Sequence, residues 1–74
     1  RIMNILNMAK IQLNGNPYMV EQGTNLEELL NKLKIKREKV AIELNGIIAQ
    51  KSNYTKISLK KNDKVEIVQF IGGG

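Results

Sequence analysis

The fold is decided by residues 24–33, which read TNLEELLNKL. The four leucines recur at the spacing i, i+3, i+4 and i+7, which places them on one face of a helix of about ten residues. Thr24 and Glu27 have the spacing of a capping box, in which the Thr24 hydroxyl accepts from the backbone of Glu27 and the Glu27 carboxylate reaches back to Thr24. We expect the leucine face to form part of the hydrophobic core, and a sheet is needed to cover it.

A hairpin is predicted before this helix. Apolar and polar residues alternate along residues 10–13 and again along residues 17–20, which is the period of a strand with one buried face. Asn14-Gly15 lies between the two stretches and supplies the left-handed backbone conformation of a tight turn. Pro17 has no backbone N–H to donate, so its strand is expected at an edge of the sheet.

A second hairpin is predicted after the helix. Residues 40–44 alternate in the same way, and Asn45-Gly46 repeats the turn signal before Ile47, Ile48 and Ala49. Residues 51–56 are polar and irregular, and residues 60–63 have the composition of a turn.

The last strand is predicted over residues 64–70. Val65 and Ile67 are expected to face the core, because Glu66 between them requires water. By the same alternation, Val68 and Phe70 point to the solvent side, where two apolar residues form a candidate docking patch. Together the elements predict an α+β domain, a mixed four- to five-stranded sheet with one helix packed across one face.

Composition excludes several classes of function. The chain has 74 residues, no cysteine and no histidine, so the usual general base, zinc ligand and activated nucleophile are missing. A self-contained hydrolase or metalloenzyme is not expected. No apolar run approaches the ~20 residues that span a bilayer, and a cytoplasmic protein is expected.

The net charge of +5 permits binding to nucleic acid or to an acidic protein surface. Much of this charge lies in residues 32–39, a basic stretch whose role the sequence does not disclose. No aromatic residue interrupts it, whereas nucleic-acid binders commonly interleave such charge with aromatic side chains that stack on bases. A solvated helix end and loop is the favoured interpretation.

The two ends of the chain differ from the domain between them. Residues 1–7 are interpreted as an N-terminal extension, disordered or left by cloning, because the first clean pattern begins after Met8. Residues 8–70 are the domain. Residues 71–74, Ile71 followed by three glycines, are interpreted as a flexible tail, because glycine lets the backbone enter a narrow channel. Such a tail suits delivery of a carboxylate into another protein's active site.

The chain resembles the ubiquitin-like β-grasp superfamily and, within it, the ThiS sulfur carriers of thiamin thiazole biosynthesis. The resemblance covers nearly everything from Met8 onward, and only the order of the motifs together with the glycine end makes it specific. It departs from the family at Asn62-Asp63, where Gly-Asp is common, and in the lysine-rich stretch after the helix. The matching motifs are Ile11-Gln12-Leu13-Asn14-Gly15, Thr24-Asn25-Leu26-Glu27-Glu28-Leu29-Leu30, Val40-Ala41-Ile42-Glu43-Leu44-Asn45-Gly46-Ile47-Ile48, Asn62-Asp63-Lys64-Val65-Glu66-Ile67-Val68 and Ile71-Gly72-Gly73-Gly74.

The resemblance implies a carrier rather than an enzyme. An adenylating enzyme similar to ThiF would use ATP to adenylate the Gly74 carboxylate, sulfur from a donor protein would displace AMP, and the thiocarboxylate would pass to a ThiG-like thiazole synthase. The chain itself would bind no cofactor and no metal. Gly72 and Gly73 would thread the adenylation site, and Val68, Phe70 and Ile71 would form the partner interface. No membrane or nucleic-acid partner is expected.

Other functions remain open from the residues alone. The same chemistry serves carriers for molybdopterin or tRNA thiolation, and a ubiquitin-like modifier would join its terminal glycine to lysines. The short connection from helix to strand and the Asn45-Gly46 hairpin favour the thiazole branch. A basic β-grasp module that binds RNA, and a purely structural domain, are the alternatives of a different class.

Overall fold

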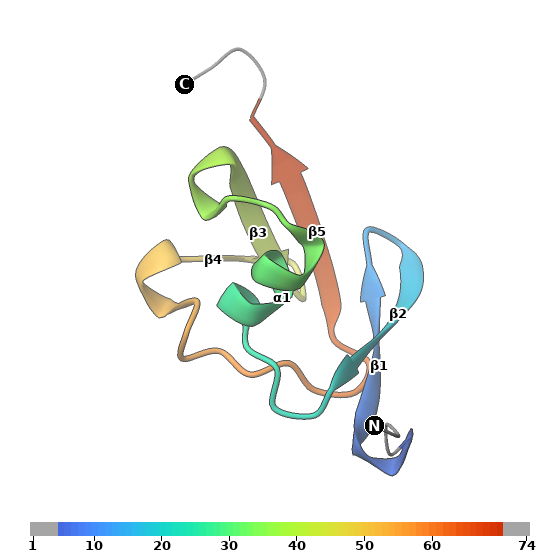
Figure 1. Cartoon of the computed structure of the whole chain (residues 1–74). Helices are drawn as coiled ribbons and strands as arrows, with labels where there is room; N and C mark the ends of the chain where they lie inside the picture. The colour runs from blue at the N-terminus through green and yellow to red at the C-terminus, as the bar shows by residue number, and fades with distance from the viewer. Residues whose placement is uncertain (1–4, 71–74) are drawn as a thin grey trace.

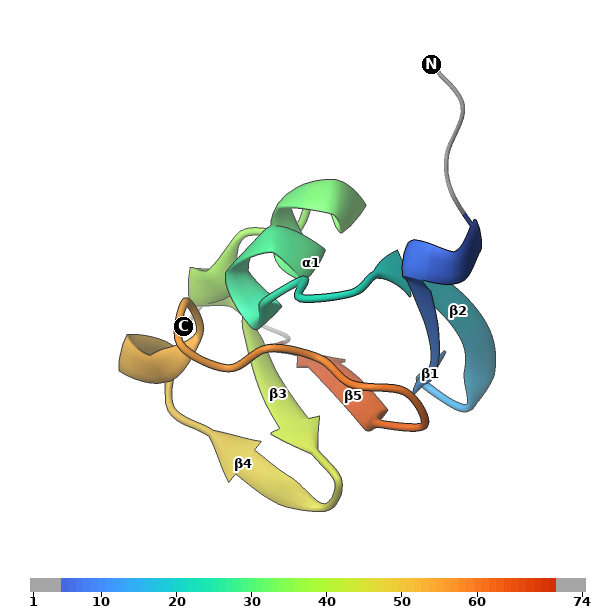
Figure 2. The same ribbon diagram turned by 90° about the horizontal axis from the view of Figure 1, so that it is seen from below.

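The computed structural model describes residues 5–70, which form a five-stranded mixed sheet with one α-helix on one face (Figures 1 and 2). The strands lie in the order β2-β1-β5-β3-β4. Nothing in the described chain covers the opposite face of the sheet (Figure 2). The predicted α+β layout is confirmed. The elements are η1 (Ile5–Asn7), β1 (Met8–Leu13), β2 (Asn16–Glu21), α1 (Leu26–Leu33), η2 (Arg37–Lys39), β3 (Val40–Leu44), β4 (Ile47–Ala49), η3 (Lys51–Asn53) and β5 (Lys64–Gln69).

Both predicted hairpins are present. Asn14 and Gly15 have φ of 49° and 84°, and Asn45 and Gly46 have φ of 54° and 85°, so both turns use the left-handed conformation that their Asn-Gly sequences favour. β2, the strand that contains Pro17, lies at an edge as predicted.

β5 is the central strand of the sheet. It runs parallel to β1, with Leu13 opposite Val65, and antiparallel to β3, with Ala41 opposite Val68. A strand in this position holds the two hairpins together, because the hairpins do not pair with each other directly. Its C-terminal end lies at the end of the sheet that is uppermost in Figure 1.

The helix α1 is eight residues long, slightly shorter than expected, and its predicted capping box is wrong by one residue. The N-cap is Asn25, whose side-chain oxygen accepts from the Glu28 N–H at 2.8 Å, while the Glu28 carboxylate accepts from the Asn25 N–H at 3.0 Å. Thr24 does not take this role: its hydroxyl donates to the Glu21 carbonyl at 2.6 Å, in the turn that follows β2, and the Glu27 N–H donates to the Tyr54 carbonyl at 3.4 Å instead. The helix therefore starts one residue later than the Thr24–Glu27 spacing predicts.

The leucine face of α1 is core, as predicted. Leu26, Leu29 and Leu30 are buried against the sheet, and Leu33 is half-buried at the end of the helix. The loop between β4 and β5 adds two further residues to the core, Tyr54 and Leu59, which are also buried. Tyr54 anchors the loop to the start of α1, since its carbonyl accepts from the Leu26 N–H at 3.1 Å.

Regular structure is present before Met8, the domain start expected from the sequence. Residues 5–7 form η1, and Gln22 binds this turn: its N–H donates to the Asn7 carbonyl at 2.6 Å, and its side-chain amide donates to the Leu6 carbonyl at 3.2 Å. The interpretation of residues 1–4 as an extension stays a prediction, because they lie outside the described residues. None of the helices between residues 5 and 70 has the length and apolar character needed to cross a bilayer.

Candidate functional site

The candidate site is the end of β5, where the central strand leaves the sheet. Val68 and Phe70 are both 52% exposed, whereas Val65 is buried and Ile67 is half-buried. The alternation predicted for this strand is confirmed. Two apolar side chains therefore reach solvent immediately before the glycine-rich end of the sequence.

Val68 lies on the sheet face that α1 does not cover. Its cross-strand neighbour is Ala41, and the next outward pair along the same two strands is Glu43 opposite Glu66. Ile48, 67% exposed, lies opposite Glu43 on the edge strand β4. The open face near the end of β5 thus combines small and medium apolar side chains with two carboxylates.

Phe70 is held at the start of β3. Its N–H donates to the Lys39 carbonyl at 2.9 Å, which continues the β3–β5 pairing by one residue. The Lys51 ammonium of η3 lies 5.3 Å from the centre of the Phe70 ring, within the range of a cation–π contact. Phe70 therefore contacts the Lys39 backbone at the end of η2 through its N–H and the Lys51 ammonium of η3 through its ring.

An asparagine from the first hairpin supports this end of β5. The β1–β5 ladder ends at Leu13 and Val65, but the Asn14 side chain reaches further: its oxygen accepts from the Ile67 N–H at 2.7 Å, and its amide donates to the Ile67 carbonyl at 3.4 Å. Asn14 thus bonds to the backbone of β5 directly before Val68. The sequence identifies Asn14 as a turn residue and carries no signal for this second contact.

Asn45 makes the equivalent contact at the start of β5. Its side-chain oxygen accepts from the Lys64 N–H at 2.8 Å, and its side-chain amide donates to the Asp63 carboxylate at 3.1 Å. The two hairpin asparagines therefore bond to the backbone of β5 at its first residue, Lys64, and at Ile67, where the ladder to β1 has already ended.

The structure brings together only part of the predicted site. Val68 and Phe70 lie two residues apart at the end of β5, as described above. Ile71, Gly72, Gly73 and Gly74 lie outside the described residues, so their predicted roles stay predictions. Lys39 and Lys51 were not predicted to lie beside Phe70, because the contact depends on how η2 and η3 are placed by the sheet.

The basic stretch after the helix is exposed at its charged positions. Within residues 5–70, the one ion pair joins the Arg37 guanidinium to the Glu27 carboxylate at 3.6 Å. The pair is partly exposed and contributes little stability. No group of three or more potential metal ligands among His, Cys, Asp and Glu occurs in the described part of the chain.

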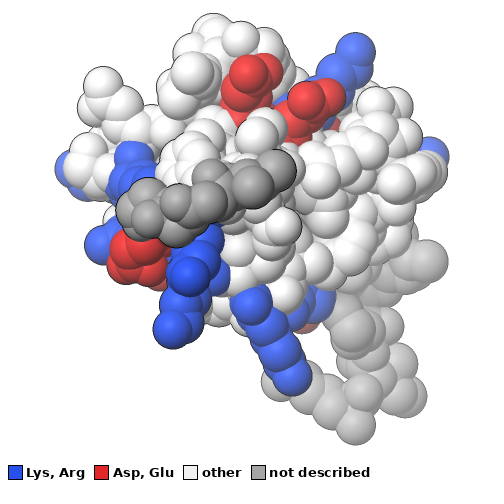
Figure 3. Space-filling model, turned by 90° about the horizontal axis from the view of Figure 1, so that it is seen from above, with Lys and Arg blue, Asp and Glu red and all other residues white. Residues whose placement is uncertain are grey.

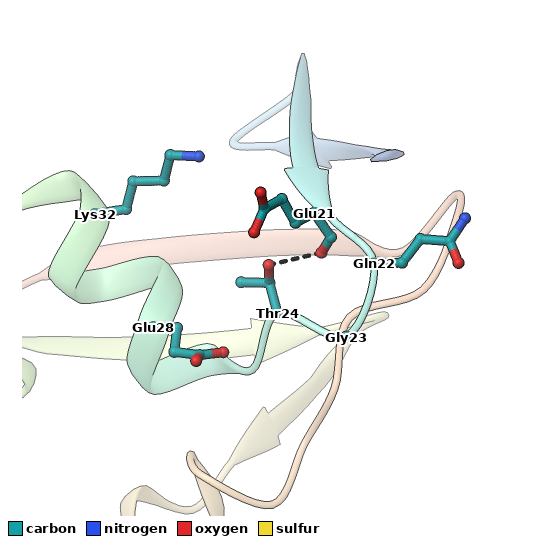
Figure 4. Close-up of a pocket in the computed structure, with 6 residues that line it drawn as sticks. All are labelled: Glu21, Gln22, Gly23, Thr24, Glu28 and Lys32. Carbon is teal, nitrogen blue, oxygen red and sulfur yellow. Dashed lines mark hydrogen bonds between the residues drawn. The ribbon is translucent and has the colours of Figure 1, made fainter. Parts of the chain in front are cut away.

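A hollow of about 300 Å³ lies at the other end of the molecule, between the end of β2 and the start of α1 (Figure 4). It is lined in part by Glu21, Thr24, Glu28 and Lys32. The Thr24 hydroxyl is bonded to the Glu21 carbonyl, and the Glu28 carboxylate caps the helix. Because these polar groups serve the turn and the helix cap, the hollow is part of the local architecture and not of the site at β5.

Comparison with known proteins gives consistent results. The model of the ThiS family matches residues 11–74. The crystal structure of thiamine biosynthesis protein ThiS from Geobacter metallireducens superposes with a TM-score of 0.77 at 35% identity, over 88% of this chain and 99% of that one. The likeness confirms the predicted β-grasp fold.

Of two curated relatives, one is matched over almost its whole length and the other is much longer than the matched segment. The sulfur carrier protein ThiS of Bacillus subtilis is 34% identical over 65 residues, which are 86% of this chain and 98% of that protein. A thiazole synthase of Magnetococcus marinus is 46% identical over 65 residues, which are 88% of this chain and only 20% of that protein. The chain therefore spans about one fifth of this longer relative.

Proposed function

Because the chain belongs to the ThiS family, we propose that it is a sulfur carrier for thiamin thiazole synthesis and not an enzyme. The observation that carries the proposal is that the family match extends through the exposed end of β5 to Gly74. The glycine end thus belongs to the pattern that the family shares, and the domain before it presents apolar side chains on which a partner can dock.

The chemistry acts on the carboxyl group of Gly74. A carboxylate oxygen attacks the α-phosphorus of ATP, pyrophosphate leaves, and an acyl adenylate forms. A sulfur nucleophile from a donor protein then attacks the acyl carbon, and AMP leaves with the electron pair of the broken C–O bond. The nucleophile is the terminal sulfur of a persulfide on the donor protein, so the product of this attack is an acyl disulfide. A thiolate then attacks the donor-side sulfur of that disulfide, the S–S bond breaks, and the thiocarboxylate leaves with the electron pair while a new disulfide forms on the donor.

An enzyme similar to ThiF supplies the adenylation, and ATP is its substrate rather than a cofactor of the carrier. The chain contains no histidine or cysteine with which to activate its own carboxylate. Gly72 and Gly73 thread the partner's active site, because residues without side chains fit a narrow channel. Val68, Phe70 and Ile71 dock beside its entrance.

The proposed acceptor is a thiazole synthase. The similarity between this chain and one fifth of the thiazole synthase of Magnetococcus marinus supports this choice over the carriers for molybdopterin or tRNA thiolation. In that protein a segment resembling the carrier is part of a chain named for the synthase.

Intact mass spectrometry tests the proposal. The chain is incubated with ATP, a sulfur source and the adenylating enzyme from the same genome, and its mass is expected to rise by about 16 Da as sulfur replaces one oxygen. Fragmentation should locate the gain in the peptide that contains Gly74, and the same chain without Gly73 and Gly74 should show none. No gain, with an enzyme that modifies another carrier, would overturn the proposal.

A further inference from the structure

The basic residues around the end of β5 have no role in the chemistry described so far. We call Lys39 and Lys51 the basic rim: Lys39 accepts the Phe70 N–H on its backbone carbonyl, and the Lys51 ammonium lies 5.3 Å from the centre of the Phe70 ring. Both side chains are exposed, and neither forms an ion pair within residues 5–70. Two exposed lysines that form no ion pair in the described part of the chain, placed beside a docking residue, indicate a surface that binds a negatively charged partner.

The neighbouring sequence strengthens this charge. Residues 34–39 contain four basic side chains and one acidic side chain, Glu38. Arg37 is partly neutralised by Glu27, so the excess lies with the lysines. Figure 3, which views the molecule from the end where β5 leaves the sheet, shows Lys and Arg side chains gathered on one side of this face with acidic atoms among them.

We infer that the basic rim binds an acidic protein surface around the entrance to the adenylation site of the activating enzyme. This inference rests on the proposed function, since it assigns a partner surface to the same site. The Phe70 N–H bond to Lys39 and the contact between Lys51 and the Phe70 ring place both lysines next to the residue that is expected to dock. The charge therefore acts where the two proteins first touch.

Distance favours protein carboxylates over the phosphates of ATP as the negative groups. The four residues after Phe70, extended into a channel, span at most about 14 Å. The four-carbon side chain of a lysine is shorter than the extended span from Phe70 to Gly74. The ammonium groups of lysines beside Phe70 therefore do not reach a nucleotide bound at Gly74. They meet the outer surface of the partner instead.

We expect the basic rim to affect the association of the carrier with the adenylating enzyme and not the chemical step. Complementary charges at the rim of an interface mainly raise the association rate, and salt screens them. Neutralising the rim should therefore lower kcat/KM for the carrier through KM, leave kcat unchanged, and reduce the dependence of kcat/KM on ionic strength.

The test compares charge-matched double variants. K39Q/K51Q removes the rim, and K60Q/K61Q removes two exposed lysines from the turn before β5, at the opposite end of that strand. Steady-state adenylation at about 0.05 M salt should show roughly a tenfold lower kcat/KM for K39Q/K51Q and a change within about twofold for K60Q/K61Q. At about 0.5 M salt the two variants should converge, and K39R/K51R should behave like the wild type. Thermal melts check that all variants are folded.

The outcomes separate this inference from the proposed function. If the wild type gains no sulfur, the carrier function itself is wrong. If the wild type gains about 16 Da but K39Q/K51Q reacts like K60Q/K61Q, the carrier function stands and the rim has no docking role. If K39Q/K51Q reacts normally but loses retention on single-stranded RNA, the rim is a nucleic-acid surface and the inference fails.

Discussion

The Asn14 side chain accepts a hydrogen bond from the Ile67 N–H at 2.7 Å, although 53 residues separate the two. This bond extends the parallel contact between β1 and β5 beyond the last paired residues, Leu13 and Val65. It therefore ties the central strand to the first hairpin directly before the candidate docking residue Val68, where β3 is the other partner of the strand. A turn residue of the first hairpin supports the site at the far end of the chain.

Asn14→Gly should loosen the end of β5. Glycine accepts the left-handed conformation at this position, where φ is 49°, so the variant mainly removes the side-chain bonds. The free energy of unfolding should fall by about 1 to 2 kcal/mol, and amide exchange at Ile67 should accelerate. Asn45→Gly is the matched control, because Asn45 occupies the same turn position and bonds to Lys64 instead. Equal exchange at Ile67 in both variants would show that Asn14 does not hold the strand end.

Asn25→Ala should destabilise the protein through the helix N-terminus. The Asn25 side chain accepts from the Glu28 N–H, and its loss leaves that N–H without its cap. We expect a decrease of about 1 kcal/mol in the free energy of unfolding, measured by urea titration. Glu28→Ala should also weaken the cap, because the Glu28 carboxylate accepts from the Asn25 N–H.

Glu27→Ala distinguishes this cap from the one that the sequence predicts. Glu27 faces Arg37 in a partly exposed ion pair, so its loss should change the free energy of unfolding by less than about 0.5 kcal/mol. If Glu27→Ala lowered the free energy of unfolding more than Glu28→Ala does, the result would support the Thr24–Glu27 capping box and contradict the cap at Asn25.

Phe70→Asp should leave the fold intact and weaken docking to the adenylating enzyme. Phe70 is 52% exposed, so an aspartate is tolerated by the domain, but it places a charge within the apolar part of the proposed interface. The KM for the carrier should rise about tenfold or more. Ile47→Asp is the control. Ile47 is 72% exposed on β4, so this substitution adds the same charge at an exposed apolar position away from the end of β5. An unchanged KM for the Phe70→Asp carrier would contradict the prediction that Phe70 is part of a docking patch.

Tyr54 should make the fold sensitive to alkali. Burial raises the pKa of the Tyr54 hydroxyl above its ordinary value of 10.0. Below pH 10 the hydroxyl is protonated in both the folded and the unfolded chain; as the pH rises further, the unfolded chain loses the proton first, so stability is lost. The free energy of unfolding of the wild type should therefore fall more steeply above about pH 10 than that of Tyr54→Phe. Parallel slopes for the two proteins would contradict the burial of this hydroxyl.

The sequence predicts much of the fold because its signals are local. The leucine spacing identifies the helix, the two Asn-Gly pairs identify the hairpins, and Pro17 places β2 at an edge. The alternation around Glu66 also predicts the exposure of Val68 and the burial of Val65. The helix start is the exception, because both Thr24 and Asn25 have a glutamate three residues later. The tertiary structure decides between them, because the Glu27 N–H donates to the distant Tyr54 carbonyl and the Glu28 N–H donates to the Asn25 side chain.

The amino-acid sequence by itself determined where the α-helix and the two hairpins form, which faces they bury and that residues 72–74 are glycines, since each depends on residues a few positions apart. The tertiary structure alone decided that Asn14 and Asn45 bond to the backbone of β5 and that the Lys39 carbonyl and the Lys51 ammonium contact Phe70. These contacts join residues separated by up to 53 positions, and they form only when β5 is inserted between β1 and β3. Hydrogen-bond geometry between distant backbones leaves no periodic signal in a sequence, which is the physical reason that the support of the site was not foreseen.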